Sequence, residues 1–286
     1  MSRNGGIMLF GLGAPKSGTS WLNGYLAGHP EVFVPPMKEL HFFNSVDGNL
    51  SGRLRRLEEK RVKLEERVAR HGKGQMDLSD LEAVRALTED GSDAAYLAYM
   101  QDGAQGRKVM ADLTPAYGLL SLERLRRMQK MANSRFIYLM RDPVARLWSN
   151  IRMNAVRMVQ KGEASDLAAT CKGLLNKVLG GKSPALQQRC DYQGTLSRIA
   201  ALDPARVLIA FYEDLFTSET VTRICDFLEI ALRPADFGTR INAGQAVVLA
   251  DADRARAAAY LKPQYAAVQA HMGRLPAQWK QAQGVA

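Results

Sequence analysis

Cysteine and long apolar runs are both scarce in this chain of 286 residues. The three cysteines, Cys171, Cys190 and Cys225, are widely spaced and form no CxxC pair, which argues against a disulfide framework and against a zinc site. The apolar run that begins at Ile7 is too short for a signal peptide or a membrane span, and no later run reaches transmembrane length. We therefore expect a cytoplasmic protein with no transmembrane segment and no metal site.

Acidic residues are also in deficit. The chain has 39 lysines and arginines against 29 aspartates and glutamates, which gives a formal net charge of +10 at pH 7. Such an excess favours an anionic partner, such as a nucleotide, a sulfated or acidic ligand, a nucleic acid or an anionic lipid, but it also keeps a surface soluble. Charge alone does not select among these partners.

Short apolar runs that favour strands alternate with segments that favour helices. The predicted strands are Ile7–Leu12, Val32–Pro35, Lys108–Asp112, Arg135–Met140 and Arg206–Phe211. The predicted helices are Thr19–Ala27, Leu119–Met131, Val144–Val159, Ala185–Ala201, Thr217–Leu228 and a segment near Ala252–His271. Near-continuous apolar strands are typical of a parallel sheet that helices cover on both faces. The pattern predicts an α/β fold: a three-layer α/β/α sandwich with a central, mostly parallel sheet and right-handed crossovers.

The segment Ser51–Gly103 interrupts this alternation. Its part Arg53–Arg70 is dense in charge and has apolar residues at helical spacing, which predicts a helix with a solvated face rather than a nucleic-acid surface. We expect a helical insertion at about residues 50–105, placed to form a lid or a wall of an acceptor pocket. Residues Gly162–Ser183 are expected to form an irregular, mobile loop. Since no repeat or interdomain linker is visible, residues 1–286 are expected to form one domain.

The segment Gly13–Trp21, with the sequence G-A-P-K-S-G-T-S-W, follows the first predicted strand. It keeps the G-x-x-x-x-G spacing of a Walker A loop, but Lys16 lies inside the loop, and Thr19 stands where a nucleotide kinase has its lysine. A strand, a glycine-bearing turn and a helix N-terminus form a P-loop-like phosphate-binding site, because unpaired N–H groups point at the ligand. The displaced lysine indicates a phosphate-like donor other than Mg-ATP.

A second motif, R-D-P, begins at Arg141, directly after a predicted buried strand. Open α/β sheets bind ligands at the carboxyl ends of their strands. Pro143 suits the first turn of the next helix, and Ser149 follows a turn or two along it. A guanidinium and a hydroxyl can hold one phosphate together. Alternatively, Arg141 pairs with Asp142 or caps the end of the sheet.

Together the two motifs resemble those of the sulfotransferase family, whose members use 3′-phosphoadenosine 5′-phosphosulfate (PAPS), and they are nearer its carbohydrate-type and bacterial branch. The resemblance continues in H-P-E-V-F-V-P at 29–35, K-E-L-H-F-F at 38–43, T-P-A-Y at 114–117 and Y-E-D at 212–214. It covers most of the chain except the charged insertion and residues 162–183. It implies transfer of a sulfuryl group from PAPS, with release of 3′-phosphoadenosine 5′-phosphate (PAP).

The resemblance implies roles for the loop residues. Lys16 would contact the 5′-phosphosulfate and stabilise negative charge on the oxygen that bridges to the departing sulfuryl group. The backbone N–H groups from Ser17 through Gly18 to Ser20, with the hydroxyls of Thr19 and Ser20, would cradle the 5′-phosphate.

The same resemblance assigns the remainder of the nucleotide. Arg141 and Ser149 would hold the 3′-phosphate, which distinguishes this donor from ordinary adenine nucleotides. Trp21 would stack against adenine, although a helix anchor in the core is a nearly equal alternative. Tyr212 would lie near the base, or else serve as a core residue at a strand end.

The acceptor, a hydroxyl or an amine, needs a base. The resemblance places Glu39 at the position of a general base, and a carboxylate beside the donor can take the acceptor proton. His41 is the competing base because imidazole titrates near neutrality; packing between Leu40 and Phe42 is its alternative role. Lys38 either contacts donor or acceptor or is simply exposed.

Two segments depart from the family pattern. Carbohydrate-type members often have a lysine just before the T-P-x-Y block, but Ala111–Thr114 contains none, which weakens the case for a heparan-like acceptor. A carbohydrate, a lipid or a small molecule all remain acceptor candidates. Near the C-terminus, Asn242–Gly244 is expected to close over the nucleotide, with Arg240 as a further phosphate contact.

Two other functions compete with sulfuryl transfer. A P-loop small-molecule kinase or NTPase needs an acidic residue at a strand end to organise Mg²⁺, and Asp112 is a candidate. A non-catalytic nucleotide-binding module would bind PAP without turnover. Sulfuryl transfer itself needs no metal, since lysine, arginine and backbone amides can stabilise an in-line transition state. We expect an anionic nucleotide donor and a separate acceptor as partners, and no nucleic acid.

Overall fold

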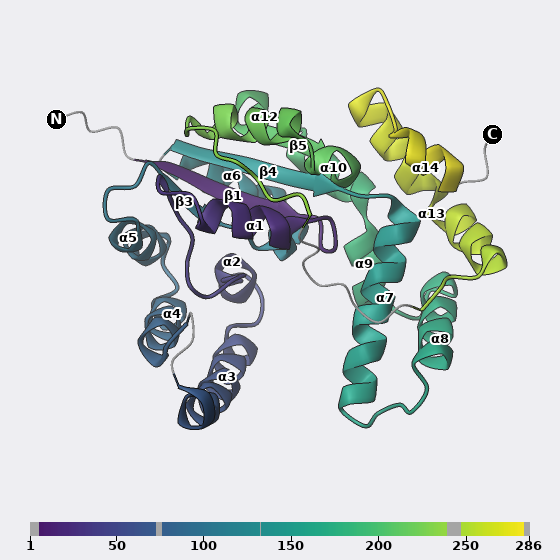
Figure 1. Ribbon diagram of the computed structural model, residues 1–286, viewed down its shortest axis with the longest axis horizontal. Helices are drawn as coiled ribbons and strands as arrows, with labels where there is room; N and C mark the ends of the chain where they lie inside the picture. Colours follow the sequence, from purple (N-terminus) through teal and green to yellow (C-terminus); the bar gives the residue numbers. More distant parts are fainter. Residues whose placement is uncertain (1–5, 73–75, 132, 239–246, 283–286) are drawn as a thin grey trace.

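A five-stranded parallel sheet forms the centre of the molecule (Figure 1). The computed structural model describes residues 6–72, 76–131, 133–238 and 247–282. Within them the strand order is β2-β3-β1-β4-β5. The strands are β1 (Ile7–Gly13), β2 (Val32–Phe33), β3 (Val109–Asp112), β4 (Asn133–Met140) and β5 (Val207–Phe211). The predicted α/β fold with a parallel central sheet is confirmed.

The central strand β1 is buried on both faces. Met8 and Phe10 enter one core cluster, and Ile7 and Leu9 enter the other, because successive side chains of a strand point to opposite faces. This explains why the strand reads as a continuous apolar run rather than an alternating one. The edge strand β2 ends earlier than predicted, before Pro35, which has no N–H to donate to a ladder.

Helices cover both faces of the sheet, which makes the three layers. On one face, α1 (Thr19–Ala27) and α12 (Ser218–Leu228) contribute Leu22 and Ile224 to the core. On the other, α6 (Leu122–Lys130) and α10 (Tyr192–Ile199) contribute Leu125 and Leu196. Figure 1 shows α12 above the sheet and the long helix α7 (Pro143–Gln160) leaving its carboxyl edge.

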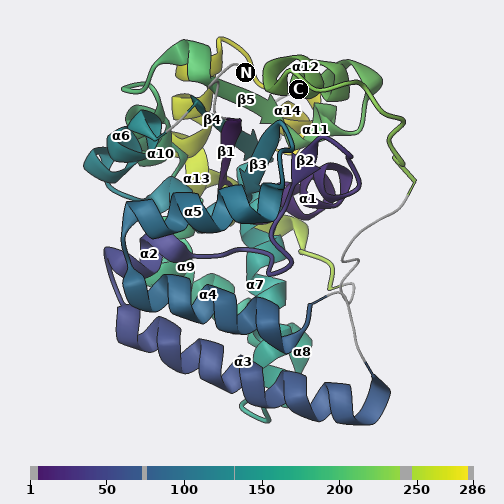
Figure 2. The ribbon, with the colours of Figure 1, turned by 90° about the vertical axis from the view of Figure 1, so that its left-hand side faces the viewer.

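In the described part of the chain, four helices lie between β2 and β3. They are α2 (Phe42–Val46), α3 (Leu50–His71), α4 (Leu78–Asp90) and α5 (Asp93–Ala104). In Figure 2, α5, α4 and α3 lie in successive rows beneath the sheet. Leu57 and Leu64 of α3 are buried, as the helical spacing predicts, and Glu59 and Arg55 face solvent. Arg53 is an exception to the expected solvated face, because it is also buried.

Two sequence predictions about the segment after α7 were wrong. The expected irregular loop at 162–183 contains a helix, α8 (Leu167–Leu179), which is capped by Asp166 and buries Cys171 and Leu175. The helix expected at Ala185–Ala201 is two helices, α9 (Pro184–Cys190) and α10. They separate at Asp191, whose carboxylate accepts the N–H of Gly194 and so starts α10.

The remaining elements connect or follow these layers. They are η1 (Pro115–Leu119), η2 (Pro204–Arg206), α11 (Tyr212–Leu215), α13 (Asp251–Met272) and α14 (Ala277–Ala282). The helix predicted at Leu119–Met131 starts later, as α6, because Ser121 caps it by accepting the N–H of Arg124. In the part of the chain that the structure describes, no helix is both long enough and apolar enough to cross a bilayer.

Candidate active site

The loop between β1 and α1 depends on two glycines with positive φ. Gly13 has a φ of 117°, and a Cβ there would lie 2.7 Å from the carbonyl oxygen of Pro115. Gly18 has a φ of 88°, and its Cβ would lie 2.6 Å from a methyl carbon of Leu215. Both positions therefore require glycine for conformation and for space. The first and last glycines of the G-x-x-x-x-G motif build the loop rather than merely loosen it.

Some loop amides are used internally, and others lie at the start of α1. Ala14 N–H donates to Leu139 O (2.7 Å), and Ser17 N–H donates to Ala14 O (3.2 Å), so the buried Ser17 anchors the turn. The N–H groups of Trp21 and Leu22 both donate to Gly18 O. The first-turn amides of Thr19 and Ser20 precede these bonds, at the helix end that attracts anions.

Lys16 lies half-buried among other cations. Burial lowers the pKa of Lys16, and the charges of Arg141, Arg152, Arg157 and Lys38 lower it further. These positive charges repel one another, and a bound anion would offset the repulsion. The loop therefore has the electrostatics of an anion site. Sequence reasoning missed Arg152 and Arg157, which lie on α7; their only signal was their position on the helix that follows Arg141.

Arg141 joins three parts of the predicted donor site. Its Nη1 donates to the backbone oxygen of Lys16 (3.2 Å), and its guanidinium lies 4.5 Å from the ring centroid of Tyr212. Tyr212 in turn packs against Gly18, since a Cβ there would lie 3.0 Å from the Tyr212 ring. The hydroxyl of the buried Tyr192 donates to Arg141 O (2.7 Å) and accepts from Arg141 N (2.8 Å).

The neighbouring Asp142 has a structural task. Its carboxylate caps α7 by accepting the N–H of Ala145 (2.7 Å), and it also accepts the hydroxyl of Tyr265 (2.6 Å). The alternative in which Asp142 pairs with Arg141 is therefore not the arrangement found. Ser149 lies in the first half of α7 and is nearly buried; its contact with a 3′-phosphate stays a prediction.

Trp21 has protein partners in this structure. It is 7% exposed, its ring stacks with those of Tyr25 and Phe237, and its Nε1 donates to Asp236 O (2.9 Å). Phe216 packs against it edge-on. This packing is what the helix-anchor alternative describes, and adenine stacking on Trp21 stays a prediction. Arg240 and Asn242–Gly244 lie outside the described residues.

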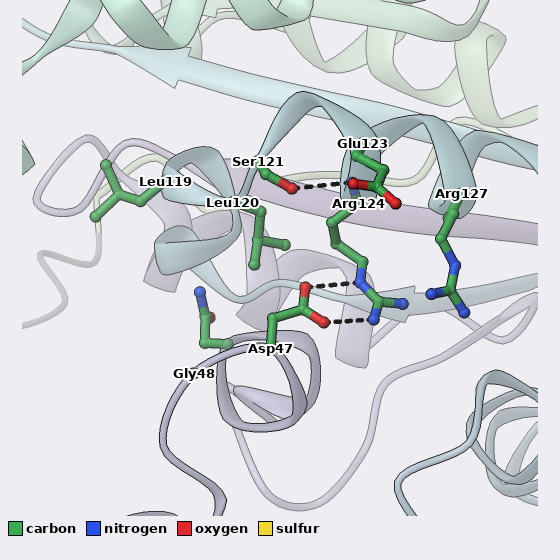
Figure 3. Close-up of a pocket in the computed structure, with 9 residues that line it drawn as sticks. Asp47, Gly48, Leu119, Leu120, Ser121, Glu123, Arg124 and Arg127 are labelled. Atoms are coloured by element: carbon green, nitrogen blue, oxygen red, sulfur yellow. Dashed lines mark hydrogen bonds and ion pairs between the residues drawn. The ribbon is translucent and has the colours of Figure 1, made fainter.

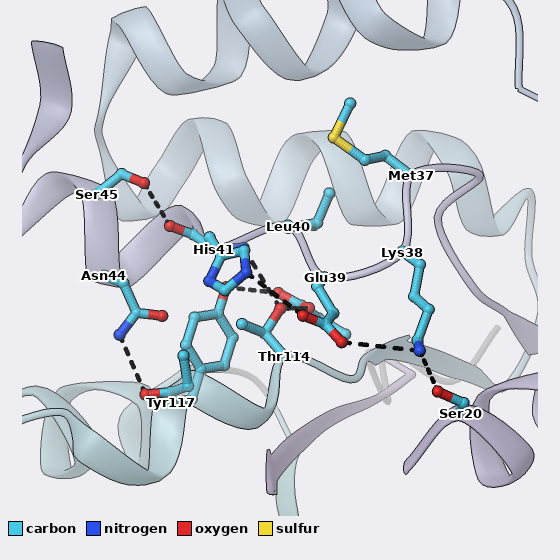
Figure 4. A network of polar contacts seen from close by, with 12 residues as sticks. Ser20, Met37, Lys38, Glu39, Leu40, His41, Asn44, Ser45, Thr114 and Tyr117 are labelled. Atoms are coloured by element: carbon cyan, nitrogen blue, oxygen red, sulfur yellow. Dashed lines mark hydrogen bonds and ion pairs between the residues drawn. The ribbon is translucent and has the colours of Figure 1, made fainter. Parts of the chain in front are cut away.

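The candidate bases lie beside the loop, linked to it through Lys38 (Figure 4). Lys38 Nζ donates to Ser20 Oγ (2.5 Å) and lies 3.7 Å from Glu39 Oε1. The other carboxylate oxygen of Glu39 lies 3.5 Å from Nε2 of His41. Burial raises the pKa of Glu39, but the hydrogen bond with His41 and the charge of Lys38 outweigh it, so the pKa is lowered overall.

Asp112 supports the segment of the candidate bases indirectly, through Thr114 and Tyr117. Its carboxylate is buried and accepts the hydroxyls of Thr114 (2.7 Å), Tyr117 (2.7 Å) and Tyr96 (2.9 Å). Burial raises the pKa of Asp112. A carboxylate that already accepts three hydroxyls is a poor ligand for Mg²⁺. Asp112 therefore no longer supports the kinase or NTPase alternative. Among the described residues, no three His, Cys, Asp or Glu side chains gather as they would around a metal ion.

A hollow of about 390 Å³ lies at the other end of α2 and shares no residue with this site (Figure 3). Arg124 dominates it and pairs with Asp47 through Nε (2.7 Å) and Nη2, and with Asp93 (2.8 Å). The charge of Arg124 is therefore already neutralised by carboxylates of the protein.

The site lies at the carboxyl edge of an α/β sheet, and the comparisons identify the class of protein as a sulfotransferase. The model of the sulfotransferase family matches residues 9–234, so the chain belongs to the sulfotransferase family. A sulfotransferase from Alicyclobacillus acidocaldarius has a similar fold, with a TM-score of 0.61 at 19% identity, over 95% of this chain and 98% of that one.

Two further solved structures are similar over part of their length. The sulfotransferase domain of the Synechococcus PCC 7002 olefin synthase is 21% identical, with a TM-score of 0.48. That of the curacin biosynthetic pathway is 24% identical, with the same TM-score. Each alignment covers 82% of this chain and 77% of the other. No curated protein sequence matches the chain.

Proposed function

We propose that this sulfotransferase takes its sulfuryl group from PAPS and transfers it to a hydroxyl or an amine. The observation that carries the proposal is the meeting of the loop lysine, Lys16, with Arg141 from the adjacent strand end, within a group of cations. PAPS has anionic groups at two separated positions, and this site offers cations on two separate elements. The loop and Lys16 would hold the 5′-phosphosulfate, and Arg141 with Ser149 the 3′-phosphate.

In the transfer, the acceptor oxygen or nitrogen forms a bond to sulfur while the bond from sulfur to the bridging oxygen breaks. The electron pair of that bond remains on the 5′-phosphate of the product PAP. Lys16 stabilises the charge that develops there, and the first-turn amides of α1 need no reorganisation to do the same. The acceptor attacks in line with the breaking bond, and its proton passes to a base beside it.

Glu39 is the better candidate for that base. Its carboxylate reaches Lys38, and Lys38 reaches Ser20 in the loop, so Glu39 is joined to the donor side of the site by two contacts. His41 contacts the other carboxylate oxygen of Glu39, so the imidazole can orient the carboxylate. The acceptor can be a carbohydrate, a lipid or a small molecule.

Transfer of radiolabelled sulfate from [³⁵S]PAPS tests this assignment, with water as the acceptor where no other is known. Glu39→Gln should lower the turnover at least 100-fold, since general base catalysis contributes about 10²–10⁴-fold. His41→Gln should lower it less, because it removes only an orienting contact. Full activity of Glu39→Gln together with an inactive His41→Gln would show that His41 is the base.

A further inference from the structure

Arg53 is a buried arginine whose guanidinium reaches the candidate base turn. It lies on α3 and is 9% exposed, and its Nη2 donates to the backbone oxygen of Leu40 (2.7 Å) and lies 3.5 Å from Met37 Sδ. Its Nε is buried without a partner, and no carboxylate of the described residues forms an ion pair with it. A buried, unpaired cation is unfavourable, so its place calls for a reason other than stability.

Leu40 stands between the two candidate bases, and both have strained backbones. Glu39 has a φ of 60° and His41 a φ of 53°, which residues other than glycine rarely adopt. Such conformations persist only where the surroundings impose them. Here the N–H of His41 donates to Thr114 Oγ1 (3.4 Å), the N–H of Phe42 donates to Tyr117 Oη (3.1 Å), and Arg53 holds the intervening carbonyl.

The three supports differ in origin. Thr114 and Tyr117 come from the segment after β3, and both are fastened to Asp112. Arg53 alone comes from the helical insertion, and it is the one charged donor among the three. A charged donor forms a stronger bond to a carbonyl than a neutral one. Without it, the Leu40–His41 peptide is held only by the long bond from His41 N–H to Thr114, so its plane can rotate and the φ angle of His41 can relax.

We propose that Arg53 is a positioning residue that holds the turn from Glu39 to His41, so that the insertion helix α3 sets where the base lies relative to the donor loop. The inference rests on the proposed function, because it takes Glu39 as the base. Relaxation of the turn would draw the Glu39 carboxylate away from Lys38. A misplacement of about 1 Å can cost about 10²-fold in rate.

The test compares Arg53→Met, Arg53→Lys and, as a matched control, Arg56→Met, an exposed arginine on the same helix. The assay is hydrolysis of [³⁵S]PAPS: a water oxygen bonds to sulfur, its proton passes to Glu39, and PAP leaves with the electron pair of the broken bond. Arg53→Met should lower the turnover about 10- to 100-fold, while the Kd for PAP by calorimetry stays within twofold. Arg53→Lys should recover much of the rate, and Arg56→Met should match the wild type.

A second measurement distinguishes positioning from loss of folding. In a Glu39→Gln background, Arg53→Met should cost less than threefold more, because its effect passes through the carboxylate already removed. Equal losses of Arg53→Met in both backgrounds, or an unchanged rate in the single variant, would overturn the inference while leaving the proposed function intact. Failure of the wild type to bind PAP would refute the proposed function, and this inference with it.

Discussion

The replacement Lys16→Met removes the loop cation and keeps the length of the side chain. In the free protein Lys16 is destabilising, because burial and four neighbouring cations lower its pKa. Below this lowered pKa, the charged Lys16 reduces the free energy of unfolding by its full amount. The reduction becomes smaller as the pH rises above the lowered pKa towards the ordinary pKa of lysine. We therefore expect Lys16→Met to unfold at a higher temperature than the wild type at pH 7, although it loses activity. Such a trade-off is typical of catalytic charges.

The catalytic loss follows from the role of Lys16 at the bridging oxygen. Removal of one preorganised donor to a developing negative charge costs about 10²–10³-fold in kcat, or roughly 2.7–4 kcal/mol. Lys38 and Arg141 remain in place, so we expect the lower end, about 100-fold. Ground-state binding should suffer less: a partly exposed ion pair is worth up to about 1 kcal/mol, which is roughly fivefold in Kd.

The assay pairs [³⁵S]PAPS turnover with the melting temperature and the Kd for PAP. Lys172→Met, at an exposed position on α8, is the control for the loss of one positive charge. A kcat within threefold of the wild type, with PAP bound normally, would refute the role of Lys16. So would a loss of activity that is entirely accounted for by a lower melting temperature.

Three more predictions concern the surroundings of the site. Tyr192→Phe removes the hydroxyl that bonds both backbone groups of Arg141. Since two hydrogen bonds are worth roughly 1–3 kcal/mol, calorimetry should show that PAP binds about tenfold more weakly and that AMP binding is almost unchanged. An equal loss for both nucleotides would contradict this prediction. The pKa of Glu39, lowered in the free protein, should rise when PAP binds, because the ligand adds negative charge and engages Lys38. A ¹³C NMR titration of labelled glutamate measures this pKa. A constant value would be inconsistent with Glu39 and PAP sharing one site. Asp112→Ala leaves three buried hydroxyls without their acceptor and should lower the free energy of unfolding by about 3 kcal/mol or more in urea; a loss below about 1 kcal/mol would mean that water or neighbours replace the carboxylate.

Much of the sheet was predictable because its strands are buried on both faces. The continuous apolar runs before Gly13 and before Arg141 identified the strands β1 and β4, and parallel strands present their carboxyl ends at one edge. The order of the strands was not readable, so the contact between Arg141 and Lys16 could only be expected through the family resemblance. The family itself was correctly predicted from those motifs.

The missed arginines share a physical cause: the sequence shows that a helix is charged but not which way a given charge points. Arg53 resembles its exposed neighbours in sequence, yet it is the one that turns inward to Leu40. Arg152 and Arg157 were not predicted as part of the site, because the sequence does not show that their charges act on Lys16. The helix α8 was obscured by its lysines and glycines, although Cys171 and Leu175 keep helical spacing.

The displaced Lys16, together with Arg141, favours a donor with a 3′-phosphate rather than Mg-ATP. Isothermal titration calorimetry of the wild type with PAP, AMP, ADP and ATP-Mg tests it most directly. We expect PAP to bind at least tenfold more tightly than AMP, ATP-Mg to have no advantage over ADP, and Arg141→Met to abolish the preference for PAP. Preference for ATP-Mg, or equal affinity for PAP and AMP, would contradict it.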